Sequence, residues 1–247
     1  MGFWEPWTGC YAASDGCKYC YYYGPYSKRF GQNTIVKTEE FDKPLRSVYM
    51  PRKKITKYVI EGGKTVATCF ATDFFLPEAD DWRGEAWNIM RQRPDLQFLF
   101  FTKRIDRFFT SLPDDWGVGY ENVTIGCTVE NQEMADYRMP LFLSYPIRYR
   151  IVGCSPLLSP IDLRPYLWGV ESVTVGGESG REARICDYDW VLDLRAQCTE
   201  ANVGFLFKCT GSRFRMGDEV KPINPRLQHR MAREFHLNTM KDEDMTL

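Results

Sequence analysis

The chain has 247 residues, 44% of them hydrophobic, which is enough for a large core and close to the size of a single-domain α/β barrel. Lys plus Arg (32) nearly balances Asp plus Glu (33), so the overall charge does not indicate a bulk nucleic-acid binder. The N-terminal residues resemble no export leader, and no apolar run reaches the roughly 18 residues of a membrane span. We therefore expect a cytoplasmic protein without membrane contact.

Short apolar or β-branched runs recur along the chain. They predict strands at 66–75, 96–104, 123–131, 149–158, 172–180 and 204–211, and the weaker "GFWEPW" predicts an additional first strand. Most of these runs are continuous rather than alternating, which is typical of strands in a parallel sheet that is buried on both faces. Stretches with helical period occur at 83–93, 104–112, 131–144 and 188–202. The repeated order predicts a parallel (βα)n barrel, partial or full, of about six to seven units.

The domain organisation follows from the same pattern. No low-complexity linker divides the chain, so we predict one domain over 1–247, with 212–247 as a C-terminal extension. Residues 43–65, which contain "PRKKITK" and "EGGK", are predicted to form a surface excursion.

Polar residues end most of the predicted strands. They are Thr72, Asp73, Thr102, Lys103, Glu130, Asn131, Ser155, Glu178, Ser179 and Lys208. Polar side chains are tolerated wherever strands meet solvent, but their recurrence over six strands favours a pocket at this rim, where parallel α/β folds place their sites.

The stretch "GCYAASDGCKYC" holds Cys10, Cys17 and Cys20 in the pattern C-x6-C-x2-C. A structural zinc site normally has four ligands, and both histidines, His229 and His236, lie near the other end of the chain, so zinc would need a remote fourth partner. A 4Fe-4S cluster that is held by three thiolates leaves one iron open to a cofactor or substrate. The count of three cysteines therefore favours a cluster.

The other cysteines are spread over the strands and helices. Cys69, Cys127, Cys154 and Cys209 fall in or beside separate strands, and Cys186 and Cys198 in or near a helical segment. We predict that the strand cysteines are core thiols, since buried free cysteine behaves as a small apolar side chain. A second metal site or a substrate thiol formed by Cys127, Cys154 and Cys209 is the alternative.

The cysteine motif resembles that of the radical S-adenosylmethionine (SAM) superfamily, in which an aromatic residue, here Tyr19, precedes the third cysteine. The usual first spacing is three residues, not six. The segments "FWEPWTGC", "SDGCKYCY", "ATDFFLPEADDWRGEAW", "FTKR", "TVENQEMADYRMP", "GGESGREARICDYDWV" and "FLFK" are similar to a family of uncharacterised phage- and prophage-associated proteins that are regarded as radical-SAM-like. This resemblance covers residues 3–211.

The resemblance implies that the three thiolates hold a 4Fe-4S cluster, that SAM binds the open iron, and that a flavodoxin or ferredoxin supplies electrons. By position, Thr72 and Asp73 would hold the SAM ammonium group, and Glu178 would face the ribose or the substrate. Tyr19, Lys103 and Asn131 would complete the cofactor-binding residues. The family's helix after the third cysteine would be displaced or irregular here, because Gly24 and Pro25 interrupt it.

Two hypotheses follow from the sequence. The first is a radical SAM enzyme that modifies an unknown, phage-related substrate. The second is a non-catalytic protein in which zinc or iron–sulfur braces the N-terminal loop. It would bind nucleic acid through basic groups at 52–57, 103–107 and 212–215, which otherwise are solvated faces. These groups also leave room for a nucleotide or nucleic-acid substrate in the first hypothesis.

Overall fold

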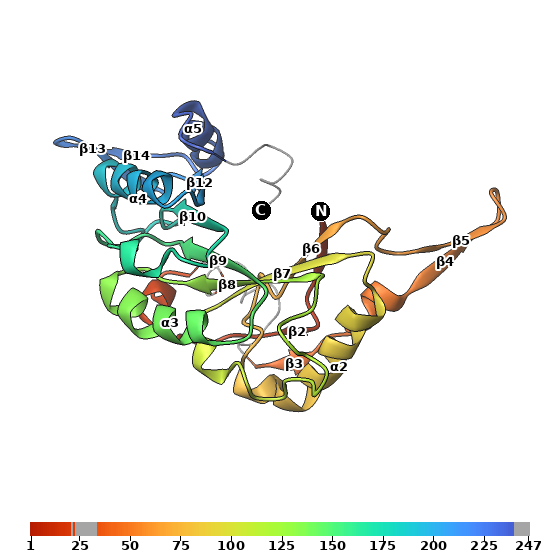
Figure 1. The fold of residues 1–247 in the computed structure, drawn as a ribbon. Coiled ribbons are helices and arrows are strands. Elements are labelled where there is room, and N and C mark those ends of the chain that lie inside the picture. The colour runs from red at the N-terminus through yellow and green to blue at the C-terminus, as the bar shows by residue number, and fades with distance from the viewer. Residues whose placement is uncertain (21, 23–33, 240–247) are drawn as a thin grey trace.

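A seven-stranded parallel sheet forms the centre of the computed structural model, which describes residues 1–20, 22 and 34–239. The strands lie in the order β1 (Gly2–Trp4), β6 (Thr65–Thr68), β7 (Gln97–Thr102), β8 (Val123–Thr128), β9 (Tyr149–Cys154), β10 (Ser172–Gly176) and β12 (Gly204–Cys209). Neighbours in the sheet are therefore successive main strands of the chain. The sheet curls into an open half-barrel (Figure 1), which confirms the predicted parallel α/β partial barrel.

The long helices of the described residues lie along the outer side of the curved sheet (Figure 1). They are α2 (Asp80–Gln92), α3 (Gln132–Ser144) and α4 (Tyr188–Glu200). The side chain of Asn131 caps α3 and that of Asp187 caps α4, each by accepting a backbone N–H of the first turn. Three of the four predicted helices are thus confirmed.

The predicted helix at 104–112 is wrong. Only the short 3-10 helix η5 (Ile105–Arg107) forms there. Ser111 adopts a left-handed backbone conformation with φ 57°, and Pro113 lies two residues further on, so no helix can run through the end of this segment. The other 3-10 helices among the described residues are η1 (Asp15–Cys17), η3 (Lys43–Leu45), η4 (Pro77–Ala79) and η6 (Arg164–Tyr166).

The remaining elements lie around the central sheet. Strands β2 (Trp7–Thr8) and β3 (Val36–Lys37) pair with each other, as do β4 (Ser47–Met50) and β5 (Ile55–Tyr58). Strands β11 (Cys186–Asp187), β13 (Arg213–Met216) and β14 (Glu219–Pro222) form a third small sheet, followed by α5 (Gln228–Glu234). Thr239 exchanges hydrogen bonds with Phe205 of β12, so the described part of the predicted C-terminal extension covers this edge strand.

Two glycines on neighbouring strands make room for an aromatic ring on the inner face of the sheet. A Cβ atom at Gly126 of β8 would lie 2.3 Å from the Phe101 ring, and one at Gly153 of β9 would lie 2.9 Å from it. The ring of Phe101 therefore lies across both strands, and it meets Phe70 edge to face at 6.0 Å. These two rings form an aromatic floor beneath the carboxyl ends of the strands.

We predict opposite effects of adding a methyl group at two glycines. Gly126→Ala should destabilise the protein by about 1–3 kcal/mol, because the new Cβ displaces the Phe101 ring. Gly84→Ala, where no heavy atom lies within 4 Å of a Cβ on α2, should stabilise it by about 0.5–1 kcal/mol. Urea denaturation of both variants measures the difference. Equal stability of the two variants would contradict the aromatic floor.

Candidate functional site

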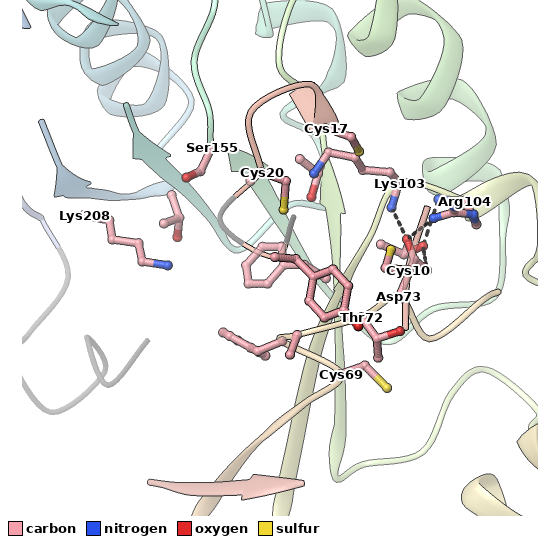
Figure 2. Close-up of a pocket in the computed structure, with 18 residues that line it drawn as sticks. Cys10, Cys17, Cys20, Cys69, Thr72, Asp73, Lys103, Arg104, Ser155 and Lys208 are labelled. Atoms are coloured by element: carbon pink, nitrogen blue, oxygen red, sulfur yellow. Dashed lines mark hydrogen bonds and ion pairs between the residues drawn. The ribbon is translucent and has the colours of Figure 1, made fainter. Parts of the chain in front are cut away.

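A pocket of about 200 Å³ lies at the carboxyl ends of the strands. A single water needs roughly 10–15 Å³ on this measure, so the pocket has room for a molecular ligand rather than one ion. Figure 2 shows it from close range. Its lining residues are Cys10, Cys17, Cys20, Tyr22, Cys69, Phe70, Ala71, Thr72, Asp73, Phe101, Thr102, Lys103, Arg104, Thr128, Gly153, Ser155, Thr174 and Lys208.

All three cysteines of the C-x6-C-x2-C motif line this pocket together with Asp73. Burial raises the pKa of Cys10 to about 12, and the nearby Asp73 carboxylate adds to the effect while Arg104 opposes it. Burial also raises the pKa of Cys20. As the side chains stand, no group of three or more His, Cys, Asp or Glu residues in the described part of the chain could hold a metal ion. The motif thus places three buried or partly buried thiols around one cavity.

A buried ion pair positions the loop that carries these thiols. Glu130, at the end of β8, is fully buried and pairs with Arg138 of α3 at 2.8 Å. The same carboxylate accepts hydrogen bonds from the Ser14 hydroxyl and from the backbone N–H of Gly16, the latter at 3.1 Å. A Cβ at Gly16 would lie 2.9 Å from the Glu130 side chain, so only glycine allows this approach. The loop between Cys10 and Cys17 is therefore anchored to the sheet by charge.

Burial opposes ionisation of Glu130, but Arg138 and the hydrogen bonds from Ser14 and Gly16 outweigh it, so the pKa of this carboxyl is lowered. Arg138 also donates to the Ser14 hydroxyl and to the Thr128 carbonyl. The carboxylate therefore stays charged and the anchor persists at neutral pH.

A second clamp joins the cysteine loop to the end of β10. Arg184 pairs with the buried Glu178 at 2.8 Å and donates to the carboxylate and carbonyl of Asp15. The Arg184 guanidinium also lies 5.3 Å from the centre of the Tyr19 ring. Glu178 and Tyr19, which the sequence analysis assigns to cofactor binding, therefore belong to this clamp, and neither is among the described residues that line the pocket.

The Asp73 carboxylate lines the pocket and accepts four hydrogen bonds from neighbouring residues. One carboxylate oxygen accepts from the Thr102 hydroxyl at 2.8 Å and the Phe75 N–H at 2.9 Å. The other accepts from the Lys103 N–H at 3.0 Å and from Arg104 at 3.2 Å. A carboxylate has about four acceptor sites, and these four donors occupy them. The Asp73 carboxylate thus holds the Arg104 segment in place, and its expected contact with the SAM ammonium group stays a prediction.

The other predicted site residues differ in their surroundings. Thr72 lines the pocket, and its hydroxyl donates to the Gly9 carbonyl beside Cys10. Lys103 lines the pocket as well, and its charge opposes the burial-induced rise in the pKa of Cys20. Asn131 does not line it, because its side chain caps α3. Of the ten strand-end polar residues, the structure thus brings six together with the thiols: Thr72, Asp73, Thr102, Lys103, Ser155 and Lys208.

A polar end lies across the pocket from Cys10 (Figure 2). Lys208 and Ser155 occupy this side of the pocket in Figure 2. The buried hydroxyl of Thr174 also lines the pocket and has no hydrogen-bond partner among the described residues. No described acidic side chain pairs with Lys208. The lining contains three cationic side chains, Lys103, Arg104 and Lys208, and one carboxylate, Asp73, so it is positively charged. The pocket suits a planar ligand that carries an anionic group.

The remaining six cysteines are buried, as predicted for the four strand cysteines Cys69, Cys127, Cys154 and Cys209. They are Cys69, Cys127, Cys154, Cys186, Cys198 and Cys209, and burial is the first cause that raises the pKa of each thiol. Of these, only Cys69 lines the described pocket. The expected irregular helix start at Gly24 and Pro25 lies outside the described residues.

The fold and the site define an α/β half-barrel with a pocket of thiols, cations and aromatic rings at its carboxyl rim. Over residues 2–241, the chain matches the model of a family described as protein of unknown function (DUF5131), and it belongs to this family. No curated protein and no solved structure matches it. Among the described residues, no helix is both long and apolar enough to cross a membrane.

Glu5 supports the segment that follows β6 and forms part of the pocket wall. It accepts the backbone N–H groups of Phe70 and Ala71 at 3.0 and 3.2 Å, while its other carboxylate oxygen is buried without a partner among the described residues. Burial raises the pKa of Glu5 to about 7, and the two backbone hydrogen bonds oppose the rise. The folded protein thus holds a proton there that the unfolded chain releases above pH 4.5.

We predict that Glu5→Gln removes a pH dependence of stability. A raised carboxyl pKa favours folding below 4.5, and this contribution disappears as the pH rises through about 7. The shift corresponds to ~3 kcal/mol, so above pH 7 the neutral amide should make the variant more stable than the wild type. Urea denaturation between pH 4 and pH 8 tests this, with the exposed Glu121→Gln as control. Parallel pH profiles for Glu5→Gln and wild type would contradict it.

Proposed function

We propose that the protein is a radical SAM-type iron–sulfur enzyme. The observation that carries this proposal is that Cys10, Cys17 and Cys20, spaced C-x6-C-x2-C, line one pocket at the carboxyl rim of a parallel half-barrel. This is the rim at which parallel α/β enzymes carry their active sites. The thiol triplet, the fold and the place of the pocket support the same function.

The donor set fits a cluster better than a single ion. In a 4Fe-4S cluster each cysteine binds a different iron, so the three sulfurs surround a volume and need not converge on one point. That requirement is compatible with thiols that line a shared cavity without forming a mononuclear site. Cys10 and Cys20, with their raised pKa values, would lose protons on binding, and Lys103 and Arg104 would stabilise the resulting negative charge. Binding would also require the thiol side chains to reorient.

When bound and reduced, such a cluster supplies the electron that cleaves S-adenosylmethionine to a 5′-deoxyadenosyl radical. The chain's own residues would hold and shield the reactants. Phe70 and Phe101 offer an aromatic surface for a planar base, and Lys208 with the unpartnered Thr174 hydroxyl offers an anion-binding end. We therefore propose a nucleotide or another phosphorylated planar compound as the substrate, and a flavodoxin or ferredoxin as the electron donor.

Single replacement of the motif cysteines tests the proposal directly. After anaerobic reconstitution, we expect Cys10→Ala, Cys17→Ala and Cys20→Ala each to lose most of the iron and labile sulfide, because two thiolates do not retain the cluster. Cys127→Ala and Cys154→Ala, which remove buried core thiols, should keep the wild-type iron content. Iron and sulfide assays with absorption spectra measure both sets.

EPR spectroscopy on the same preparations tests whether one iron of the cluster is open to SAM. Adding SAM to the reduced wild-type protein should change the EPR spectrum of the cluster, and dithionite should then produce 5′-deoxyadenosine. Purified protein with stoichiometric zinc and no iron would instead support the non-catalytic metal protein. An EPR spectrum that SAM leaves unchanged would also overturn the enzyme proposal.

The anion-binding end makes a separate prediction. Lys208→Ala should weaken the binding of AMP by about ten- to a hundredfold, the loss of one charge-assisted hydrogen bond, and should change adenosine binding far less. Calorimetry on the cluster-free protein measures this independently of iron, and Lys64→Ala, at an exposed lysine, is the control. Equal weakening of AMP and adenosine would contradict an anion subsite at Lys208.

A further inference from the structure

The hairpin of β4 and β5 projects from the body of the molecule as an isolated two-stranded arm (Figure 1). Every residue of both strands is exposed, and so is the connecting turn at 51–54. An isolated two-stranded hairpin in water is only marginally stable by itself. An exposed hairpin of this kind is therefore a candidate binding surface.

The arm is fixed at its base. Arg93, fully buried after α2, donates to the carbonyls of Pro44 and Ile60 on the two sides of the hairpin. Its guanidinium also stacks on the Tyr58 ring, 3.9 Å from the ring centre. The two sides are joined by a hydrogen bond from the Val59 N–H to the Arg46 carbonyl, at 2.8 Å. The base of the arm, residues 43–46 and 57–60, is therefore held in place, and we call it the stem.

The charge on the arm has one sign. Residues 43–60 contain six basic residues and no acidic residue, whereas the whole chain has a net charge of −1. At the stem, Lys43 and Arg46 pair with acidic neighbours, and Lys57 pairs with Glu61. At the tip, Arg52, Lys53 and Lys54 have no ion-pair partner among the described residues. The unpaired positive charge is thus concentrated at the tip of the arm.

The register separates two unlike faces. Ser47, Tyr49, Thr56 and Tyr58 share one face, because Ser47 lies opposite Tyr58 and Tyr49 opposite Thr56. The other face carries Val48, Met50, Ile55 and Lys57. Tyr49 is 58% exposed and Val48 57% exposed, although side chains of this kind are usually at least half buried in strands. One face offers hydroxyls and rings, and the other an apolar strip.

We propose that the β4–β5 arm binds nucleic acid, with the tip on the phosphate backbone and the hydroxyl and aromatic face toward sugars or bases. A two-stranded ribbon fits the DNA major groove, and Arg, Lys, Ser, Thr and Tyr are the usual donors to phosphate oxygens. This inference concerns a surface outside the pocket and does not rest on the proposed radical chemistry.

Two other macromolecular partners fit the arm less well. A hairpin that inserts into a lipid surface would present apolar side chains first, whereas here the charged tip precedes Met50 and Ile55. A protein interface is depleted of lysine at its centre, whereas Lys53, Lys54 and Lys57 occupy the middle of this segment. The charge at the tip therefore favours a polyanion.

The test compares two triple neutralisations of the full-length protein. One removes the tip charge by Arg52→Gln, Lys53→Gln and Lys54→Gln. The other removes the same charge elsewhere by Lys221→Gln, Arg226→Gln and Arg230→Gln, which are also exposed. Fluorescence anisotropy with a labelled DNA duplex and a labelled single strand, over a range of salt concentrations, measures binding. Thermal melting confirms that both variants fold.

The wild type should bind DNA, and the tip variant should lose about tenfold or more in affinity. Its plot of log K against log salt should be less steep by up to ~2.7, since each lost phosphate contact removes about 0.9. The control variant should retain both affinity and slope. No binding by the wild type, an equal loss in both variants, or tip-dependent binding to phosphatidylserine vesicles without DNA binding would overturn the proposal.

Discussion

The candidate site depends on one buried charge pair, between Glu130 and Arg138. The side chains are 0% and 2% exposed, and an isolated charge at that depth would be very costly. Each charge is compensated by the other and by hydrogen bonds to the Thr128 carbonyl, the Ser14 hydroxyl and the Gly16 N–H. The pair contributes little net stability by general experience with buried ion pairs. Its effect is positional, because it fixes a loop of small polar residues against the rim of the sheet.

Much of the fold follows from the sequence. Continuous runs such as "LQFLFF" identify buried parallel strands, and their regular spacing predicts neighbours in chain order, as found from β6 to β12. The helix expected at 104–112 fails because the left-handed conformation of Ser111 is a property of tertiary context that periodicity does not report. Helix α5 is short, with seven residues, and has too few turns for its period to stand out.

The site is less predictable than the fold. Strand-end position places Thr72, Asp73 and Lys103 correctly at the pocket, since topology alone brings them together. It does not distinguish a ligand contact from an internal one: Glu178 faces Arg184, and Asn131 caps a helix. Phe101 and its two glycine neighbours are absent from the expected set. Gly126 and Gly153 interrupt otherwise bulky strands, and that is the signal from which a ring lying across the sheet could have been inferred.

The anchors of the cysteine loop also bear on how a cluster and the fold would be coupled. In many small metal-binding domains the ligands converge only when the metal binds, so metal affinity and folding are inseparable. Here the thiol loop is held by Glu130, Arg138 and Arg184, none of which is a thiol or a proposed ligand. The half-barrel core beneath it is continuous and aromatic-rich. The stability of the fold therefore comes mainly from the core, while the ion pairs position the loop without using its thiols.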